Sequence, residues 1–131
     1  MNKIPACILS IQNHDILNIV SFDFCGFKMS MMSLELKDIR PKDKVLLFVK
    51  PTSVAIGKNF MGDISYSNQL KGKIKSLKNG ELLTSLEVLV GEFVLCSIIT
   101  KNSSLRMNLK KGDEVVCFIK ASDLSILEKT S

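Results

Sequence analysis

Residues 69–77 and 82–90, QLKGKIKSL and LLTSLEVLV, flank Lys78-Asn79-Gly80-Glu81, and this stretch decides how the chain folds. Every second residue from position 71 to position 75 is lysine, whereas Leu70 and Ile74 fall on the opposite face of an extended strand. An Asn-Gly pair between two strand-like segments is the strongest local signal for a hairpin. The stretch therefore predicts two antiparallel strands joined by a tight turn.

The segments that follow extend this pattern to five strands. Gly91-Glu92 predicts a second turn before a strand over 93–100, and residues 102–109 predict a short helix or an irregular turn. Val115–Ile119 is continuously apolar, as expected of a strand that is buried on both faces. A last short strand, Ser125–Leu127, completes five within the same repeat. Five short strands in about 65 residues predict a small Greek-key barrel of the OB type.

The chain repeats this unit, because three segments of its first half can be aligned with segments of its second half. The fold class predicted is all-β, with two tandem OB-like five-stranded Greek-key barrels. We expect the first repeat to span residues 1–60 and the second to span residues 64–131, with the joint at 58–63. The aligned segments are Lys42–Lys50 with Gly112–Lys120 (offset 70), Asn2–Ile11 with Asn68–Leu77 (offset 66), and Ser30–Ser33 with Ser97–Thr100 (offset 67).

Composition excludes several classes of protein. The 131 residues carry 18 Lys and Arg against 13 Asp and Glu, and a net charge of +5 favours anionic partners of any kind. The longest apolar run, Val45–Val49, is far shorter than the roughly 20 residues of a membrane span, and no signal peptide is expected. Cys7, Cys25, Cys96 and Cys117 have no C-x-x-C spacing, which indicates buried thiols in a reduced, cytoplasmic protein. With His14 as the single histidine, we expect neither a metal site nor an enzyme.

Three motifs in the second repeat resemble a known family. Residues 65–74, SYSNQLKGKI, resemble the opening S-x-R-N-Q-L-x-G-x-[IV] of a molbindin (Mop, TOBE-type) module. Ser97–Thr100 resembles its central S-I-T strand, and residues 112–124 resemble its closing G-D-x-V…I-K-A-S-x-V. The first repeat is similar but degraded, with Lys50-Pro51-Thr52-Ser53-Val54 at its closing motif. The resemblance implies a di-Mop protein that binds molybdate or tungstate at subunit interfaces in the cytoplasm, for storage, homeostasis or sensing of molybdenum, without an organic cofactor.

The resemblance also implies a set of binding residues. Molybdate is a tetrahedral dianion whose oxygens accept hydrogen bonds, so its site needs hydroxyls, backbone N–H groups and a cation. Lys120-Ala121-Ser122 offers all three kinds of donor at the end of a strand. The expected oxyanion-binding residues are Ser65, Ser67, Asn68, Thr100, Lys120, Ala121 and Ser122 of the second repeat, and Ser33, Lys50, Thr52 and Ser53 of the first.

Two departures from the family predict unequal sites. The arginine of the opening motif is Ser67 here, and losing a charge-assisted hydrogen bond costs about 1.5–3 kcal/mol. The first repeat begins at Met1-Asn2, so it has no equivalents of Ser65 and Ser67. A barrel of about 60 residues is marginally stable alone, so we also expect a homo-oligomer, dimer or trimer, with sites at the joins.

Other interpretations of the same residues stay open. Lys120 could pair with Asp113 or Asp123, and Ser122 and Thr52 could simply end strands through local hydrogen bonds. The lysines at 71, 73 and 75 could contact nucleic acid as in other OB barrels, but no aromatic residue is expected on their face, which favours a charged edge. The methionines at 29, 31 and 32 indicate core filling rather than a Cu(I) site. A Mop-fold interaction module that has lost its ligand is the remaining alternative, because Ser67 replaces the arginine.

Overall fold

Strands dominate the computed structural model, which describes residues 2–36 and 38–131. The strands are β1 (Asn2–His14), β2 (Leu17–Phe24), β3 (Phe27–Ser33), β4 (Lys44–Val49), β5 (Ala55–Gly57), β6 (Asn68–Asn79), β7 (Leu83–Val90), β8 (Phe93–Thr100), β9 (Glu114–Ile119) and β10 (Ser125–Lys129). One α-helix, α1 (Lys101–Arg106), and two 3₁₀ turns, η1 (Pro51–Ser53) and η2 (Ala121–Asp123), complete the elements of the described residues. None of the helical segments in these ranges has the length and apolar character that a membrane crossing requires.

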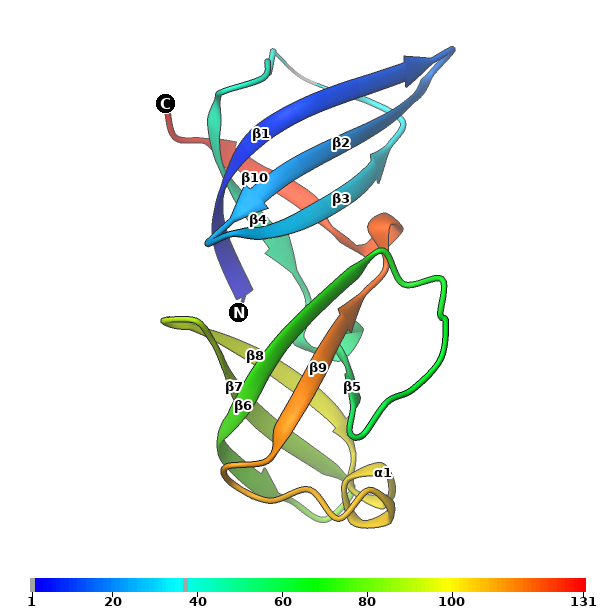
Figure 1. The fold of residues 1–131 in the computed structure, drawn as a ribbon, viewed down its shortest axis with the longest axis vertical. Helices are drawn as coiled ribbons and strands as arrows, with labels where there is room; N and C mark the ends of the chain where they lie inside the picture. Colours follow the sequence, from blue (N-terminus) through cyan, green and yellow to red (C-terminus); the bar gives the residue numbers. More distant parts are fainter. Residues whose placement is uncertain (1, 37) are drawn as a thin grey trace.

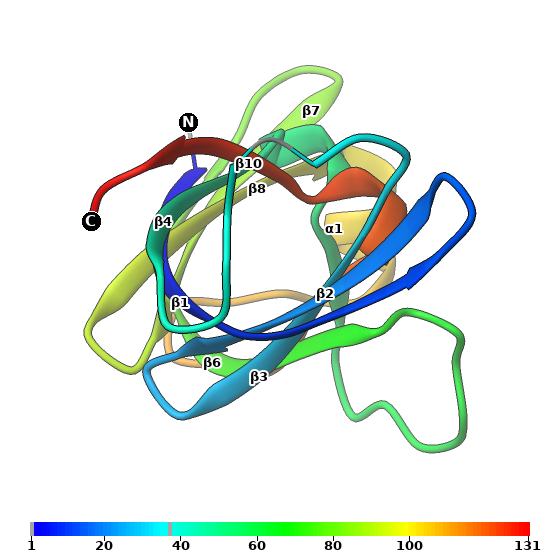
Figure 2. The same cartoon turned by 90° about the horizontal axis from the view of Figure 1, so that it is seen from above.

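The strands form two five-stranded sheets that follow one another along the long axis of the molecule (Figure 1). The β1 sheet has the order β10-β4-β1-β2-β3, and the β6 sheet has the order β5-β9-β6-β7-β8. Seen from above, the strands curl around the long axis rather than lying flat (Figure 2). The predicted all-β class with two five-stranded units is confirmed.

The last strand of each sheet comes from the other half of the chain. β10 pairs antiparallel with β4, and β5 pairs antiparallel with β9. The prediction that Ser125–Leu127 completes the sheet of its own repeat is therefore wrong, since these residues belong to the β1 sheet. Residues 55–57 and 125–127 are three-residue stretches at equivalent places, so their side-chain pattern does not reveal which strand they will pair with.

The long central strands curl because each contains a bulge. β1 changes register between Ile8 and Ser10, and β6 changes register between Ile74 and Ser76, at positions 66 residues apart. A bulge bends its strand and increases its twist, so one half of β1 pairs with β4 while the other half pairs with β2. Beside the second bulge, a Cβ added to Gly72 would lie 2.6 Å from the carbonyl oxygen of Leu89, so this position requires glycine.

Two asparagines join the sheets in a reciprocal way. The side chain of Asn68 accepts from the backbone N–H of Ser30 (2.7 Å) and donates to the carbonyl oxygens of Ser30 (3.0 Å) and Ile119 (3.1 Å). The side chain of Asn2 accepts from the N–H of Cys96 (2.7 Å) and donates to its carbonyl oxygen (2.8 Å). Both asparagines are buried. We call these contacts the asparagine clamps. They give hydrogen-bond partners to partly buried backbone groups of Ser30 and Cys96 and to the buried carbonyl oxygen of Ile119.

The clamps also correct the sequence alignment of the third strands. Ser30 pairs with Ser21 and Cys96 pairs with Glu87, so Ser30 and Cys96 are equivalent and the offset is 66. The predicted offset of 67 is wrong by one residue, which in a strand moves every side chain to the opposite face. As a consequence, Ser33 is the equivalent of Ile99, and Leu34 is the equivalent of Thr100.

One continuous apolar core runs through both sheets. Met29 and Met31 are buried in it, as predicted, while Met32 is exposed. Cys117 is buried, and burial raises the pKa of its thiol to about 12. The prediction of buried thiols is wrong for Cys25, which is exposed, and holds only in part for the half-buried Cys7 and Cys96.

Ion pairs fasten each exchanged strand to the other half of the chain. Lys58, directly after β5, pairs with Asp113 at 3.0 Å, and Lys129 of β10 pairs with Asp43 at 3.2 Å. The hydrogen bond from Lys58 lowers the pKa of Asp113, and the backbone N–H of Arg40 lowers the pKa of Asp43. These pairs lie at equivalent turns, so the exchange is stabilised in the same way twice.

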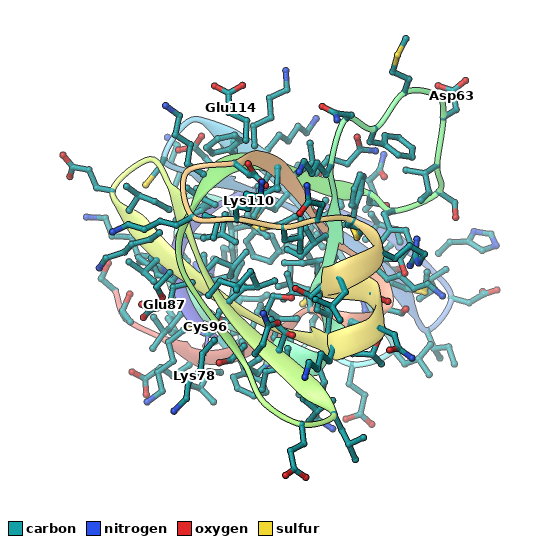
Figure 3. The ribbon with its side chains drawn as sticks, turned by 90° about the horizontal axis from the view of Figure 1, so that it is seen from below. Asp63, Lys78, Glu87, Cys96, Lys110 and Glu114 are labelled. Atoms are coloured by element: carbon teal, nitrogen blue, oxygen red, sulfur yellow. The ribbon has the colours of Figure 1, made fainter. Side chains whose placement is uncertain are left out.

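Residues 58–67 form a loop between β5 and β6 that stands out from the sheets (Figure 1). Asp63 lies on the outer part of this loop, away from α1 (Figure 3). Phe60 lies beside Lys71 and Lys73 in a shallow depression. The expectation that no aromatic residue accompanies these lysines is therefore wrong, because it considered β6 without the loop that packs next to it.

Candidate functional site

A groove of about 590 Å³ runs between the two halves of the chain, and we call it the polar groove. Its described lining comes from η1 and the start of β5, from the loop before β6, from the end of β8 and the start of α1, and from η2. The lining residues are Thr52, Ser53, Val54, Ala55, Tyr66, Leu83, Ile98, Ile99, Thr100, Ser103, Lys120, Ser122 and Asp123.

The exchange of β5 and β10 creates this groove. Each exchanged strand is preceded by a lysine in extended conformation and a 3₁₀ turn, closed by the bonds Ser53 N–H to Lys50 O (2.9 Å) and Asp123 N–H to Lys120 O (3.0 Å). Because both turns lie where the chain crosses between the sheets, η1 packs on β8 of the other half. Hydroxyls from both halves, Thr52 and Ser122, thus line one space.

Lys120 supplies positive charge to the polar groove. Within residues 2–36 and 38–131 no ion pair involves Lys120, and Asp113 is paired with Lys58 instead. The ammonium Nζ lies 5.8 Å from the centroid of the Tyr66 ring. Asp123 also contributes a carboxylate to the described lining. Lys120 and Asp123 are both exposed, so solvent screens the charge of each.

Thr100 lies at the edge of the polar groove and also caps a helix. It is the N-cap of α1, and its hydroxyl oxygen accepts from the N–H of Ser103 at 3.1 Å. The same hydroxyl donates to the Ser103 side chain at 2.9 Å. The two oxygens therefore form one hydrogen-bonded pair at the rim, and the sequence missed Ser103.

The structure gathers five of the predicted residues in this groove and leaves six outside it. Inside are Thr52, Ser53, Thr100, Lys120 and Ser122. Ser65 and Ser67 are exposed on the 58–67 loop, Lys50 and Ala121 lie outside the described lining, and Ser33 lines a different groove. Asn68 is buried in its clamp, with both N–H groups of its amide already donating, so we leave it out of the site proposed below.

Tyr66 is the most informative residue that sequence reasoning missed. It occupies the variable position of the opening motif, between Ser65 and Ser67, and a variable position carries no expectation. The one feature of the sequence that could have indicated a role for Tyr66 is an aromatic residue between two predicted binding residues, Ser65 and Ser67. Leu83, Ile98 and Ile99 were assigned to strands without a role at their ends, and they form the apolar wall of the polar groove.

A second groove, about 650 Å³, occupies the equivalent place on the β1 sheet, and we call it the apolar groove. Leu34 stands where the polar groove has Thr100, and Met32 stands where it has Ile98. The carboxylates of Glu35, Asp38 and Glu128 also line it. Ser122 lines both grooves, so they adjoin at η2.

Comparison with known proteins places the chain in a family. The TOBE domain profile matches residues 64–126. Molybdenum-pterin-binding proteins 1 and 3 of Clostridium pasteurianum are 37% identical over 65 residues and 42% identical over 67 residues. Each alignment covers 49% of this chain and 96% of the relative.

A solved structure of the cytoplasmic molybdate-binding protein ModG, with molybdate bound, aligns with 95% of this chain and 94% of its own. The TM-score is 0.89 at 20% identity, which shows that the two proteins share the fold over both halves. The fold therefore defines an all-β protein of two five-stranded units rather than a single OB barrel. The chain belongs to the molbindin family of Mop, TOBE-type proteins.

Proposed function

We propose that this protein binds molybdate or tungstate non-covalently in the polar groove, for storage or homeostasis of molybdenum in the cytoplasm. The observation that carries the proposal is the convergence of the Lys120 ammonium with the hydroxyls of Thr52 and Ser122 from two halves of the chain. Ammonium and hydroxyl donors match the acceptor oxygens of a tetrahedral dianion. The molybdate-bound ModG and the molybdenum-pterin-binding relatives support molybdenum as the element.

The polar part of the groove suits an inorganic oxyanion. The hydroxyls of Thr52, Ser53 and Ser122 and the Lys120 ammonium, which share the described lining, are donors for its oxygens. The proposed activity is capture and release, and no bond is made or broken in the ligand.

A homo-oligomer belongs to the same proposal. Leu83, a lining residue, is 54% exposed, and its neighbours Leu82 and Leu105 are 80% and 59% exposed. Apolar side chains that surround a ligand groove are typical of a surface that a second chain covers. Lys101 and Arg106 lie on α1 near this rim. In its described part, the apolar groove is lined by Glu35, Asp38 and Glu128 and by one lysine, Lys129, so its excess of acid complements the basic α1 for contact between copies.

Isothermal titration of the purified protein with molybdate, tungstate and sulfate tests the proposal. We expect saturable binding of the first two and much weaker binding of sulfate, because donors and charge suit all three ions and cavity size discriminates among them. Lys120→Gln removes the ammonium and is expected to lower the affinity at least tenfold, since a hydrogen bond to a charged group contributes about 1.5–3 kcal/mol. Lys28→Gln, at an exposed position on β3, is the matched control for lost surface charge.

Two outcomes contradict the proposal. Absence of heat with both molybdate and tungstate at micromolar protein excludes the function. Equal affinity of wild type and Lys120→Gln excludes the groove as the site. Light scattering during size-exclusion chromatography measures the oligomer separately, and a monomer that binds molybdate would remove only the interface from the proposal.

A further inference from the structure

Lys120 and Tyr66 lie close together in the polar groove although they are 54 residues apart in the sequence. Lys120 follows β9 and Tyr66 precedes β6, and the ammonium lies 5.8 Å from the ring centroid. Within about 6 Å, a cation is attracted to the negative face of an aromatic ring. A ring differs from a carboxylate in one decisive respect, because it attracts the ammonium without cancelling its charge.

The Tyr66 ring is also held by other aromatic side chains. It packs against Phe118 with ring centroids 5.8 Å apart at 70°, and Phe118 is itself buried. Phe60, from the 58–67 loop, packs on Phe118 at 5.2 Å and also at 70°. The carbonyl oxygen of Tyr66 accepts from the Gln69 side chain at 3.1 Å. Ring and backbone are therefore both restrained, and the ring offers Lys120 a fixed partner.

We propose that Tyr66 is a positioning residue that holds the Lys120 ammonium over the polar groove, ready to donate to a tetrahedral oxyanion. The inference rests on the proposed function and adds the means by which this chain orients its cation. Ser67, which follows Tyr66 and stands where the family motif has arginine, is exposed and uncharged. Orientation of Lys120 is therefore assigned to the Tyr66 ring.

The expected size of the effect follows from the strength of the contact. A cation–π pair at an exposed site stabilises by an amount equivalent to about a two- to fivefold change in an equilibrium constant. Without the ring, the Lys120 side chain is free to move in the unbound protein. The entropy lost when it becomes ordered then reduces the binding free energy. We expect the loss to fall on affinity and to act entirely through Lys120.

A double-mutant cycle tests this, with tungstate as the titrant and calorimetry as the readout. Tyr66→Phe keeps the ring and is expected to bind within twofold of wild type, whereas Tyr66→Leu is expected to bind two- to fivefold more weakly. In a Lys120→Gln background, Tyr66→Leu is expected to cause no further loss. Tyr66→Gln is the second ring-removing variant if Tyr66→Leu lowers the melting temperature.

Tyrosine emission gives an independent spectroscopic readout. The chain contains 1 Tyr and 0 Trp, so emission near the tyrosine maximum reports on Tyr66 alone. Tungstate is expected to change this emission with the dissociation constant measured by calorimetry, and sulfate at the same concentrations is expected to leave it unchanged.

The outcomes separate this inference from the proposed function. If wild type binds tungstate and Tyr66→Leu binds equally well, the positioning role is overturned and the function stands. A loss of equal size in the Lys120→Gln background, or an equal loss in Tyr66→Phe, also overturns it. If wild type binds neither tungstate nor molybdate, the proposed function fails and the role of Tyr66 fails with it.

Discussion

The polar groove and the apolar groove occupy equivalent places in one chain, yet their linings have opposite chemistry. Both lie where a 3₁₀ turn crosses to the other sheet and packs beside the end of a third strand, β8 in one case and β3 in the other. Thr100 at the end of β8 is replaced by Leu34 after β3. The backbone arrangement around the two grooves is the same because strand pairing and buried residues maintain it. Residues at strand ends can change without disturbing the fold.

The strongest way to break this comparison is to remove an asparagine clamp, because both grooves depend on the contact between the halves. Asn68→Ala is expected to lower the free energy of unfolding by about 2–3 kcal/mol, since buried backbone groups of Ser30 and Ile119 lose their partners. Asn2→Ala, with two hydrogen bonds to Cys96, is expected to cost about 1–2 kcal/mol. Urea unfolding measures both, with the exposed Asn102→Ala as control. Equal stability of Asn68→Ala and wild type would show that the clamp does not hold the halves together.

A second test exchanges small residues at equivalent positions of β1 and β6. Gly72→Ala is expected to destabilise by about 1–2 kcal/mol, because the new Cβ would lie 2.6 Å from the Leu89 carbonyl oxygen. Ala6 is the equivalent residue of β1 and is already tolerated there, so Ala6→Gly is expected to cost about 0.5–1 kcal/mol through chain entropy. If Gly72→Ala costs less than Ala6→Gly in urea unfolding, the Leu89 carbonyl group does not restrict position 72 as its distance indicates.

A third test makes the polar groove resemble its counterpart. Thr100→Leu removes the cap of α1 and both hydrogen bonds that hold Ser103 at the rim, and the oxyanion affinity is expected to fall about three- to tenfold because Ser103 is no longer held in place. Leu34→Thr in the apolar groove is expected to create no second site, because Glu35, Asp38 and Glu128 line that groove against a single cation of the described lining, Lys129, which pairs with Asp43. Titration calorimetry measures affinity and stoichiometry. A second binding event in Leu34→Thr would contradict the idea that the carboxylates exclude anions.

The smallest effect concerns acid stability. The pKa values of Asp43 and Asp113 are lowered by their hydrogen bonds from backbone N–H groups and lysines. A carboxylate with a lowered folded pKa contributes stability above its unfolded value, about 3.8, and this contribution is lost as pH falls through the folded value. The melting temperature of wild type is therefore expected to drop more between pH 5 and pH 3 than that of Asp43→Asn/Asp113→Asn. Parallel curves from circular dichroism would show that these pairs add nothing measurable.

Much of the fold follows from local pattern, and the reason can be seen in particular elements. The lysine alternation and the Asn79-Gly80 pair predicted β6 and β7 to within two residues, because strand faces are determined by neighbouring residues. The turn itself lies one residue later than predicted, since Asn79 still pairs with Thr84 and residues 80–82 connect the strands. For residues 102–109 the prediction left a short helix or an irregular turn open, and α1 covers the first part of this segment. The alignment of the third strands failed by one residue, because matching serines outweighed the register of the hairpins.

The candidate site was predicted less completely than the fold. The closing motif identified Lys120 and Ser122, and its degraded copy identified Thr52 and Ser53, all of which line the polar groove. Asn68 belongs to the opening motif but is buried in a clamp, since a sequence pattern does not separate ligand residues from structural ones. Tyr66 could not be chosen before the positions of Phe118 and Lys120 were known.

The sequence by itself determined the number of strands, the two faces of β6, the repetition of the unit and the motifs that identify the family. Only the tertiary structure decided that β5 and β10 join the opposite sheets, and therefore which hydroxyls and which cation share a groove. The physical reason is the distance along the sequence over which each interaction acts. Alternation and turn chemistry act between residues close in sequence, whereas the choice between two equivalent sheet edges depends on backbone pairing, ion pairs and clamps between residues far apart in the chain.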